Sequence, residues 1–186
     1  MKKESFIYST LTIGGSKEQV NEVMKYICDD IYDIGSIDLN KICAVPVHLN
    51  IGPDDEVSCG EKLYRHYLGR TKNLSRHYLD LVPYPTEEEE ENFLAVLSRA
   101  DQRRFLLGKM AVLNRKEYGY PTYTGWCTEH WGTDENVISF EECNENSIAF
   151  LTHSAPASEA IHTLSILFPK VKLTVAWEEN KVAIMD

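Results

Sequence analysis

A short aromatic segment holds the most reactive side chains of this sequence. Trp126, Cys127, His130 and Trp131 occupy positions i, i+1, i+4 and i+5. If the segment is helical, Trp126 and His130 share one face, and Cys127 lies three residues from His130. An imidazole at that spacing can lower the pKa of a thiol and hold the thiolate, as a cysteine nucleophile requires. The sequence supplies no orienting third group, so the alternative is that Cys127 is a small buried residue between packing tryptophans.

The same segment offers two of four candidate zinc ligands. Zinc accepts the mixed set of Cys127, His130, Cys143 and His153. Two, twelve and nine residues separate them in turn, and these spacings do not correspond to a zinc knuckle. We therefore predict no metal site, and no cofactor.

Basic and aromatic side chains alternate over residues 60–80. Single-stranded nucleic acid binds such stretches through phosphate pairing and base stacking. The contacts are predicted to come from Arg65, Tyr67, Arg70, Lys72 and Arg76. The alternative is a solvated basic face that balances the acidic run 87–91. The net charge of −10, from 19 Lys and Arg against 29 Asp and Glu, favours this alternative, because the chain as a whole repels phosphate.

Two strand–helix–strand patterns position these segments, one at each end of the chain. Residues 5–13 alternate in polarity and are rich in β-branched and aromatic types, which predicts a strand. A capping box at Ser16 and Gln19 starts a helix that is predicted over about residues 17–30. A second strand is predicted to end at Val47, beside a proline.

The C-terminal end repeats this order. Residues 147–152 form a short apolar segment that predicts a strand, and an apolar stripe that ends at Phe168 predicts a helix. Alternating polarity over residues 171–178 predicts a last strand with one buried face. That face is predicted to carry Val171, Leu173, Val175 and Trp177.

Two such halves form the ferredoxin-like split βαβ sandwich, an α+β fold in which a four-stranded antiparallel sheet carries two helices on one face. The length of 186 residues fits a single domain, residues 1–186. Its core is predicted to be residues 1–47 and 147–186. Residues 48–146 are predicted to be a large, mainly helical insertion between strands two and three.

The insertion carries helix signals of its own. Thr86 and Glu89 have capping-box spacing at the start of the acidic run, where acids also suit the helix dipole. A further helix is predicted from one apolar stripe, formed by Leu106, Leu107, Met110 and Leu113.

The block before the second half resembles the YubB-type ferredoxin-like domain family, uncharacterised proteins of bacteria, plasmids and phages. The similar residues are Trp126-Cys127, Trp131-Gly132-Thr133, Thr10-Leu11-Thr12-Ile13-Gly14 and Leu39-Asn40-Lys41-Ile42 with Pro46. The resemblance implies the ferredoxin-like fold and an origin in bacteria or mobile elements, and it implies no activity. The chain departs from the family pattern at 134–137 and 152–157, where two tryptophans and a lysine of the pattern are missing.

The function that we predict is that of a non-enzymatic binding or interaction protein, whose partner is a protein or a small molecule. The predicted binding residues are Tyr120, Trp126, His130, Trp131 and Thr133. Two alternatives stay open. One is a nucleic-acid-binding accessory protein that uses residues 60–80, and the other is a small cysteine-dependent enzyme that uses Cys127 and His130.

Composition argues against a membrane protein. The chain is 43% hydrophobic and 26% charged, as globular proteins are, and no apolar run approaches the roughly 18 residues that span a bilayer. We therefore predict no membrane partner. Five cysteines without a close-set framework indicate reduced thiols, which predicts a cytoplasmic location.

Overall fold

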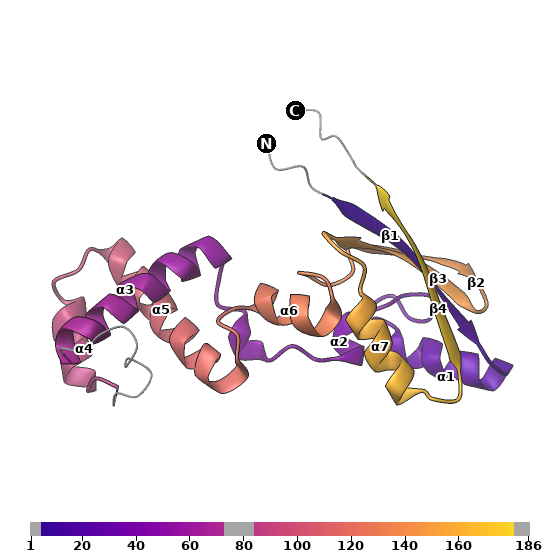
Figure 1. Ribbon diagram of the computed structural model, residues 1–186, viewed down its shortest axis with the longest axis horizontal. Coiled ribbons are helices and arrows are strands. Elements are labelled where there is room, and N and C mark those ends of the chain that lie inside the picture. Colours follow the sequence, from indigo (N-terminus) through magenta and orange to yellow (C-terminus); the bar gives the residue numbers. More distant parts are fainter. Residues whose placement is uncertain (1–4, 73–83, 181–186) are drawn as a thin grey trace. The chain divides into compact units, whose positions relative to one another are not determined.

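The computed structural model describes residues 5–72 and 84–180 (Figure 1). The chain divides into two compact units, where the sequence predicted one domain with an insertion. The sheet unit lies within Met1–Val45 and Thr124–Asp186, and the helical unit is Pro46–Tyr123. Residues 124–146, which were expected in the insertion, therefore belong with the sheet.

The sheet unit contains a four-stranded antiparallel sheet in the order β2-β3-β1-β4. Its strands are β1 (Phe6–Gly14), β2 (Ser139–Asn144), β3 (Ser147–His153) and β4 (Lys172–Asn180). At the centre, Leu11 of β1 pairs with Ile148 of β3 on one side and with Val175 of β4 on the other. The predicted α+β class and the antiparallel four-stranded sheet are confirmed, and so are the strands predicted at 5–13, 147–152 and 171–178.

One face of the sheet is covered by α1 (Lys17–Ile27) and α7 (Ser158–Leu167) (Figure 1). The side chains of β1 alternate between this face and the other, so every second residue is buried. The buried members are Ile7, Ser9, Leu11 and Ile13. The capping box that starts α1 is present, because the Ser16 N–H donates to Gln19 Oε1 over 2.8 Å.

The prediction of a second strand that ends at Val47 is wrong. Residues there form the short helix α2 (Leu39–Ile42) and the 3₁₀ turn η1 (Val47–Leu49). Asp38 caps α2 by accepting from the Asn40 N–H, and Leu39 and Ile42 bury one helical face at a spacing of three. The second strand is β2 instead, so the helical unit precedes it in the chain rather than following it.

The helical unit contains α3 (Asp54–Lys72), α4 (Glu87–Leu94) and α5 (Arg99–Tyr118), and α6 (Tyr123–Trp131) starts at its end. The capping box predicted at Thr86 and Glu89 is present at the start of α4. Helices α3 and α5 cross with their backbones in contact at two glycines. A methyl group on Gly60 would overlap the Arg104 carbonyl, and one on Gly108 would overlap the Gly60 carbonyl.

The core of the helical unit lies where α3 and α5 meet. It consists of Tyr64, Tyr67, Leu68, Phe105 and Val112, with Phe93 and Leu94 of α4 packed against it. The aromatic rings pack edge to face or tilted, with centroids 4.5 to 6.1 Å apart. Tyr67 of α3, which was a candidate for nucleic-acid contact, therefore forms part of a core.

Candidate functional site

The aromatic block of the sequence lies on α6 and in the turn that follows, and most of it is buried. Trp131 and Cys127 have no exposed surface, and Trp126 is 7% exposed. The Trp131 indole Nε1–H donates to the Cys43 carbonyl over 2.9 Å, and the Thr133 hydroxyl donates to the His153 carbonyl over 2.7 Å. These bonds attach α6 to the chain after α2 and to the end of β3. The block is thus built into the sheet unit.

Among Trp126, Cys127, His130 and Trp131, His130 is the residue with partly exposed surface. Its ring lies 4.2 Å from that of Trp126 and is tilted by 31°. Cys127 lies on the same helix but is fully buried, and a thiol acts as a nucleophile only where a substrate can reach it. Tyr120, the fifth predicted binding residue, belongs to the helical unit. The arrangement therefore offers packing rather than covalent chemistry.

Among the residues whose side chains the structure describes, no three His, Cys, Asp or Glu side chains are grouped so that they could hold a metal ion. His153 instead points at a carboxylate, with Nδ1 3.0 Å from Asp134 Oδ2. The side chain of Cys143 lies outside the described part of the structure.

The residues predicted to contact nucleic acid are divided by the fold. Tyr67 is 5% exposed and packs on Phe93 at 4.5 Å, so its ring is not available to stack on a base. Arg65 pairs with Glu61 at 3.0 Å along α3. The backbone of Arg70 and Lys72 belongs to the last turn of α3, but their side chains lie outside the described residues, as does all of Arg76.

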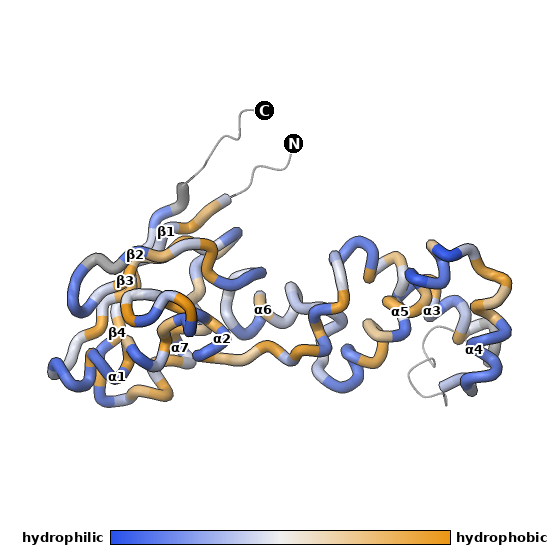
Figure 2. Tube along the Cα trace, turned by 180° about the vertical axis from the view of Figure 1, so that it is seen from behind, coloured by the Kyte–Doolittle hydropathy of each residue, from blue (hydrophilic) through white to orange (hydrophobic). Residues whose placement is uncertain are grey.

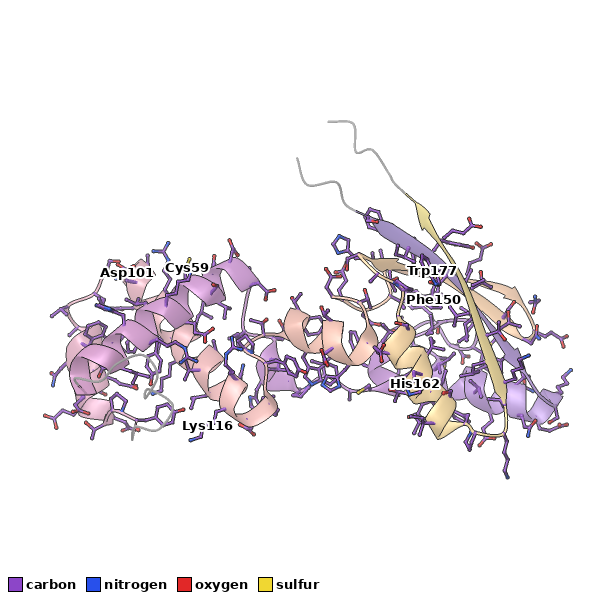
Figure 3. All side chains as sticks on the ribbon, viewed as in Figure 1. Cys59, Asp101, Lys116, Phe150, His162 and Trp177 are labelled. Carbon is purple, nitrogen blue, oxygen red and sulfur yellow. The ribbon has the colours of Figure 1, made fainter. Side chains whose placement is uncertain are left out.

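A hollow of about 200 Å³ lies between α3 and α5, and we call it the cationic hollow. Its lining consists of Arg65, Tyr84, Val112, Arg115 and Lys116, of which Figure 3 labels Lys116. Glu61 Oε1 accepts from the Nε–H of both arginines, from Arg65 at 3.0 Å and from Arg115 at 3.3 Å. The Lys116 ammonium lies 5.2 Å from the centre of the Tyr84 ring. Two arginines thus pair with the Glu61 carboxylate, and Lys116 lies over the Tyr84 ring.

Glu61 is held in its charged form. Burial raises the pKa of its carboxyl, but hydrogen bonds and charges of Arg115 and Arg65 outweigh this, so the pKa lies below its ordinary value. One turn further along α3, burial and then the nearby Glu90 raise the pKa of Tyr64. Glu90 also accepts from the Tyr64 hydroxyl and pairs with Lys109. Both carboxylates therefore stabilise the helix packing.

An apolar surface lies along α5, formed by residues that were predicted to belong to one apolar stripe with Leu107. Leu106, Met110 and Leu113 are 47%, 43% and 38% exposed, and we call them the α5 stripe. The core side of the helix is formed by Phe105, Leu107, Ala111 and Val112 instead. In the sequence, these residues are spaced by four and then three, which indicates one helix face. The spacing does not show whether that face is buried or exposed.

The described residues contain no helix that is long and apolar enough to cross a bilayer. No protein-family model, no curated protein and no solved structure matches this chain.

Proposed function

We propose that this chain is a non-enzymatic protein-binding module, and that the α5 stripe receives an amphipathic helix of its partner. The observation that carries the proposal is the exposure of Leu106, Met110 and Leu113 on one face of one helix. An apolar row with a charged rim is the usual anatomy of an interface, and helices bind such rows through side chains spaced by three and four residues. Exposed Arg103 and Glu117 continue the row at its two ends.

The packing of the helical unit supports this assignment. Because the glycines bring α3 against one side of α5, the residues on another side of α5 remain accessible to a partner. Hydrophobic and hydrophilic residues alternate along this helix (Figure 2). Both ends of α5 are capped, since Ser98 accepts from the Asp101 N–H and Gly119 adopts φ 83°. A rigid helix loses little conformational entropy when a partner binds to it.

We also propose that the sheet unit has a ferredoxin-like fold. Its strands and covering helices follow the order β1-α1-β2-β3-α7-β4, with sheet order β2-β3-β1-β4, which supports a ferredoxin-like split βαβ fold with the helical unit inserted before the second strand. Membership of the YubB-type family, with its bacterial or mobile-element origin, rests on the Trp126-Cys127 and Trp131-Gly132-Thr133 motifs. On this proposal those motifs attach α6 to the sheet.

The experiment places a photo-crosslinking amino acid at Met110 and, as a control, at the exposed Glu88 of α4. In cells that produce the chain, Met110 is expected to give a discrete crosslinked partner that Glu88 does not give. Charge at the ends of the stripe, as Leu106→Glu with Leu113→Glu, is expected to abolish that product without changing the circular dichroism. Equal crosslinking at both positions, or a product that survives the charges, contradicts the proposal.

A second candidate function is binding of a nucleic-acid strand at the cationic hollow. The observation that favours it is that Arg115 and Lys116 lie together at the hollow, next to Tyr84, which is 37% exposed. Fluorescence anisotropy with a labelled oligothymidylate tests it, with Arg115→Gln and Lys116→Gln against Arg99→Gln on the same helix. Binding that weakens only with the first two changes supports this function, and no binding at low salt excludes it.

A further inference from the structure

The strand β4 forms one edge of the sheet and pairs with β1 on one side. No strand among the described residues pairs with its other side. It is nine residues long, and an unprotected edge of this length presents a row of backbone N–H and C=O groups that can pair with another chain. The opposite edge, β2, has six residues and an irregular register between Glu142 and Asn144. Such an irregularity protects an edge, so β4 is the edge open to pairing.

An apolar groove lies beside this edge, between β4 and α7. It has a volume of about 330 Å³ and is lined by Pro156, Ser158, Ile161, His162, Ser165, Leu173, Val175 and Trp177. Trp177 and His162 border it from the two elements (Figure 3). Trp177 pairs with the buried Ser9 and so faces the helices, yet it is 57% exposed. The alternating polarity of residues 171–178 predicted a buried face for Trp177, and the position of β4 at an edge of the sheet explains the difference.

The charges of β4 are arranged to suit a second copy of itself. Lys172 stands at its start and Glu178 near its end, and both side chains face away from the helices, since their partners in β1 are Gly14 and Tyr8. Neither residue forms an ion pair within the part of the chain that the structure describes. In an antiparallel pair of identical strands, the start of one strand lies opposite the end of the other.

We propose that two copies of this chain associate through β4, as antiparallel strands related by a two-fold axis at Val175. In this register Lys172 lies directly opposite Glu178 of the second copy, and Leu173 lies opposite its Trp177. Each pair occurs twice because of the symmetry. The two sheets then form one continuous sheet with both α7 helices on the same face, and each Trp177 covers the groove of the other copy.

Other registers lose this match. With the axis at Ala176, Lys172 lies opposite Asn180, and with the axis at Thr174 it lies opposite Ala176. A shift of one residue between the strands brings the helix-covered face of one copy beside the open face of the other, so that Trp177 leaves the groove. The axis at Val175 satisfies both the charges and the apolar side chains of the edge.

Charge exchange tests the interface by sedimentation equilibrium. The wild-type chain is expected to dimerise, and Lys172→Glu or Glu178→Lys alone is expected to raise the dissociation constant about tenfold, because two attractive pairs become repulsive. The double variant, and an equimolar mixture of the two single variants, are expected to recover the wild-type constant. A wild-type chain that stays monomeric at millimolar concentration overturns the proposal, as does a dimer that is indifferent to both charges.

Cysteine crosslinking tests the register independently. In a Cys59→Ser background, which removes an exposed thiol, Val175→Cys is expected to form an intermolecular disulfide, because residues directly opposite each other have Cβ atoms within reach. Ala176→Cys serves as the control, since the two copies of residue 176 lie diagonally and about 7–8 Å apart in this register. Crosslinking at residue 176 and not at 175 overturns the proposed axis.

Discussion

The indole of Trp131 donates a hydrogen bond to the carbonyl oxygen of Cys43, so the end of α6 is attached to the segment that follows α2. We expect Trp131→Phe to lower the free energy of unfolding by about 2 kcal/mol, because the Cys43 carbonyl loses its donor and the smaller buried ring leaves a cavity. Urea denaturation at low protein concentration measures this. Trp177→Phe, at an exposed ring, is the control and is expected to change stability little. A loss of unfolding free energy no larger than that of the control would contradict a structural role for Trp131.

The contact of α3 with α5 at Gly60 and Gly108 predicts a sharp steric effect. Gly108→Ala is expected to destabilise the helical unit by about 3 kcal/mol, because the added methyl meets backbone that cannot move aside. Gly119→Ala is a matched control at the end of the same helix. Its methyl meets nothing within 4 Å, so only the strain of φ 83° remains, which costs about 1 kcal/mol. Thermal unfolding that ranks the two changes in the reverse order would contradict the packing.

Glu61 gives a pH dependence whose sign follows from its lowered pKa. Such a carboxyl stabilises the fold fully above its unfolded pKa of about 4.3, and the contribution is lost as the pH falls through the lower folded value. Glu61→Gln is therefore expected to lose stability at neutral pH and to show a smaller further loss on acidification. Unfolding measured between neutral pH and about pH 3 gives the slope of the free energy of unfolding against pH for the wild type and for the variant. The exposed Glu88→Gln is the control, and a Glu61→Gln slope equal to the wild-type slope would oppose this role.

Removal of the Ser9 hydroxyl is expected to increase stability. Its hydroxyl is buried in the centre of β1 and has no hydrogen-bond partner within the described structure. Replacing an unsatisfied buried hydroxyl by a methyl removes its desolvation cost, so Ser9→Ala is expected to stabilise the sheet unit by about 1 kcal/mol. The melting temperature records the change, and Thr12→Ala, on the exposed face of the same strand, gives the reference. A destabilised Ser9→Ala would indicate that the hydroxyl is bound.

Local signals were sufficient for much of the fold. The alternation in β1 and the capping boxes at Ser16 and Thr86 act within a few residues, so they could be predicted from sequence. The failed strand before Val47 had a local counter-signal, since Asp38 followed by apolar residues three apart is typical of a capped helix turn. The true second strand could not be predicted in the same way, because β2 is polar and short and pairs through its neighbour β3.

The candidate sites were harder to predict, because exposure depends on tertiary packing. The spacing typical of a buried helix face occurs at Tyr64, Tyr67 and Leu68. For predicting burial, this spacing is a stronger signal than the basic residues that alternate with them. Conversely, Leu106 and Leu107 are neighbours of equal hydropathy, and only contact with α3 decides which of them is buried. The same applies to Trp177, whose exposure follows from the place of β4 at an edge of the sheet.

On our proposal, the reactive residues of this chain serve its structure, and its surfaces act by binding. The measurement that tests this most directly is the rate at which iodoacetamide labels each thiol of the native chain, resolved by peptide mass spectrometry. Cys59 is exposed and is expected to react like a free thiol, whereas buried Cys127 is expected to react only as fast as the sheet unit opens. Labelling of Cys127 faster than Cys59 at neutral pH would show an accessible, activated thiol and would contradict this account.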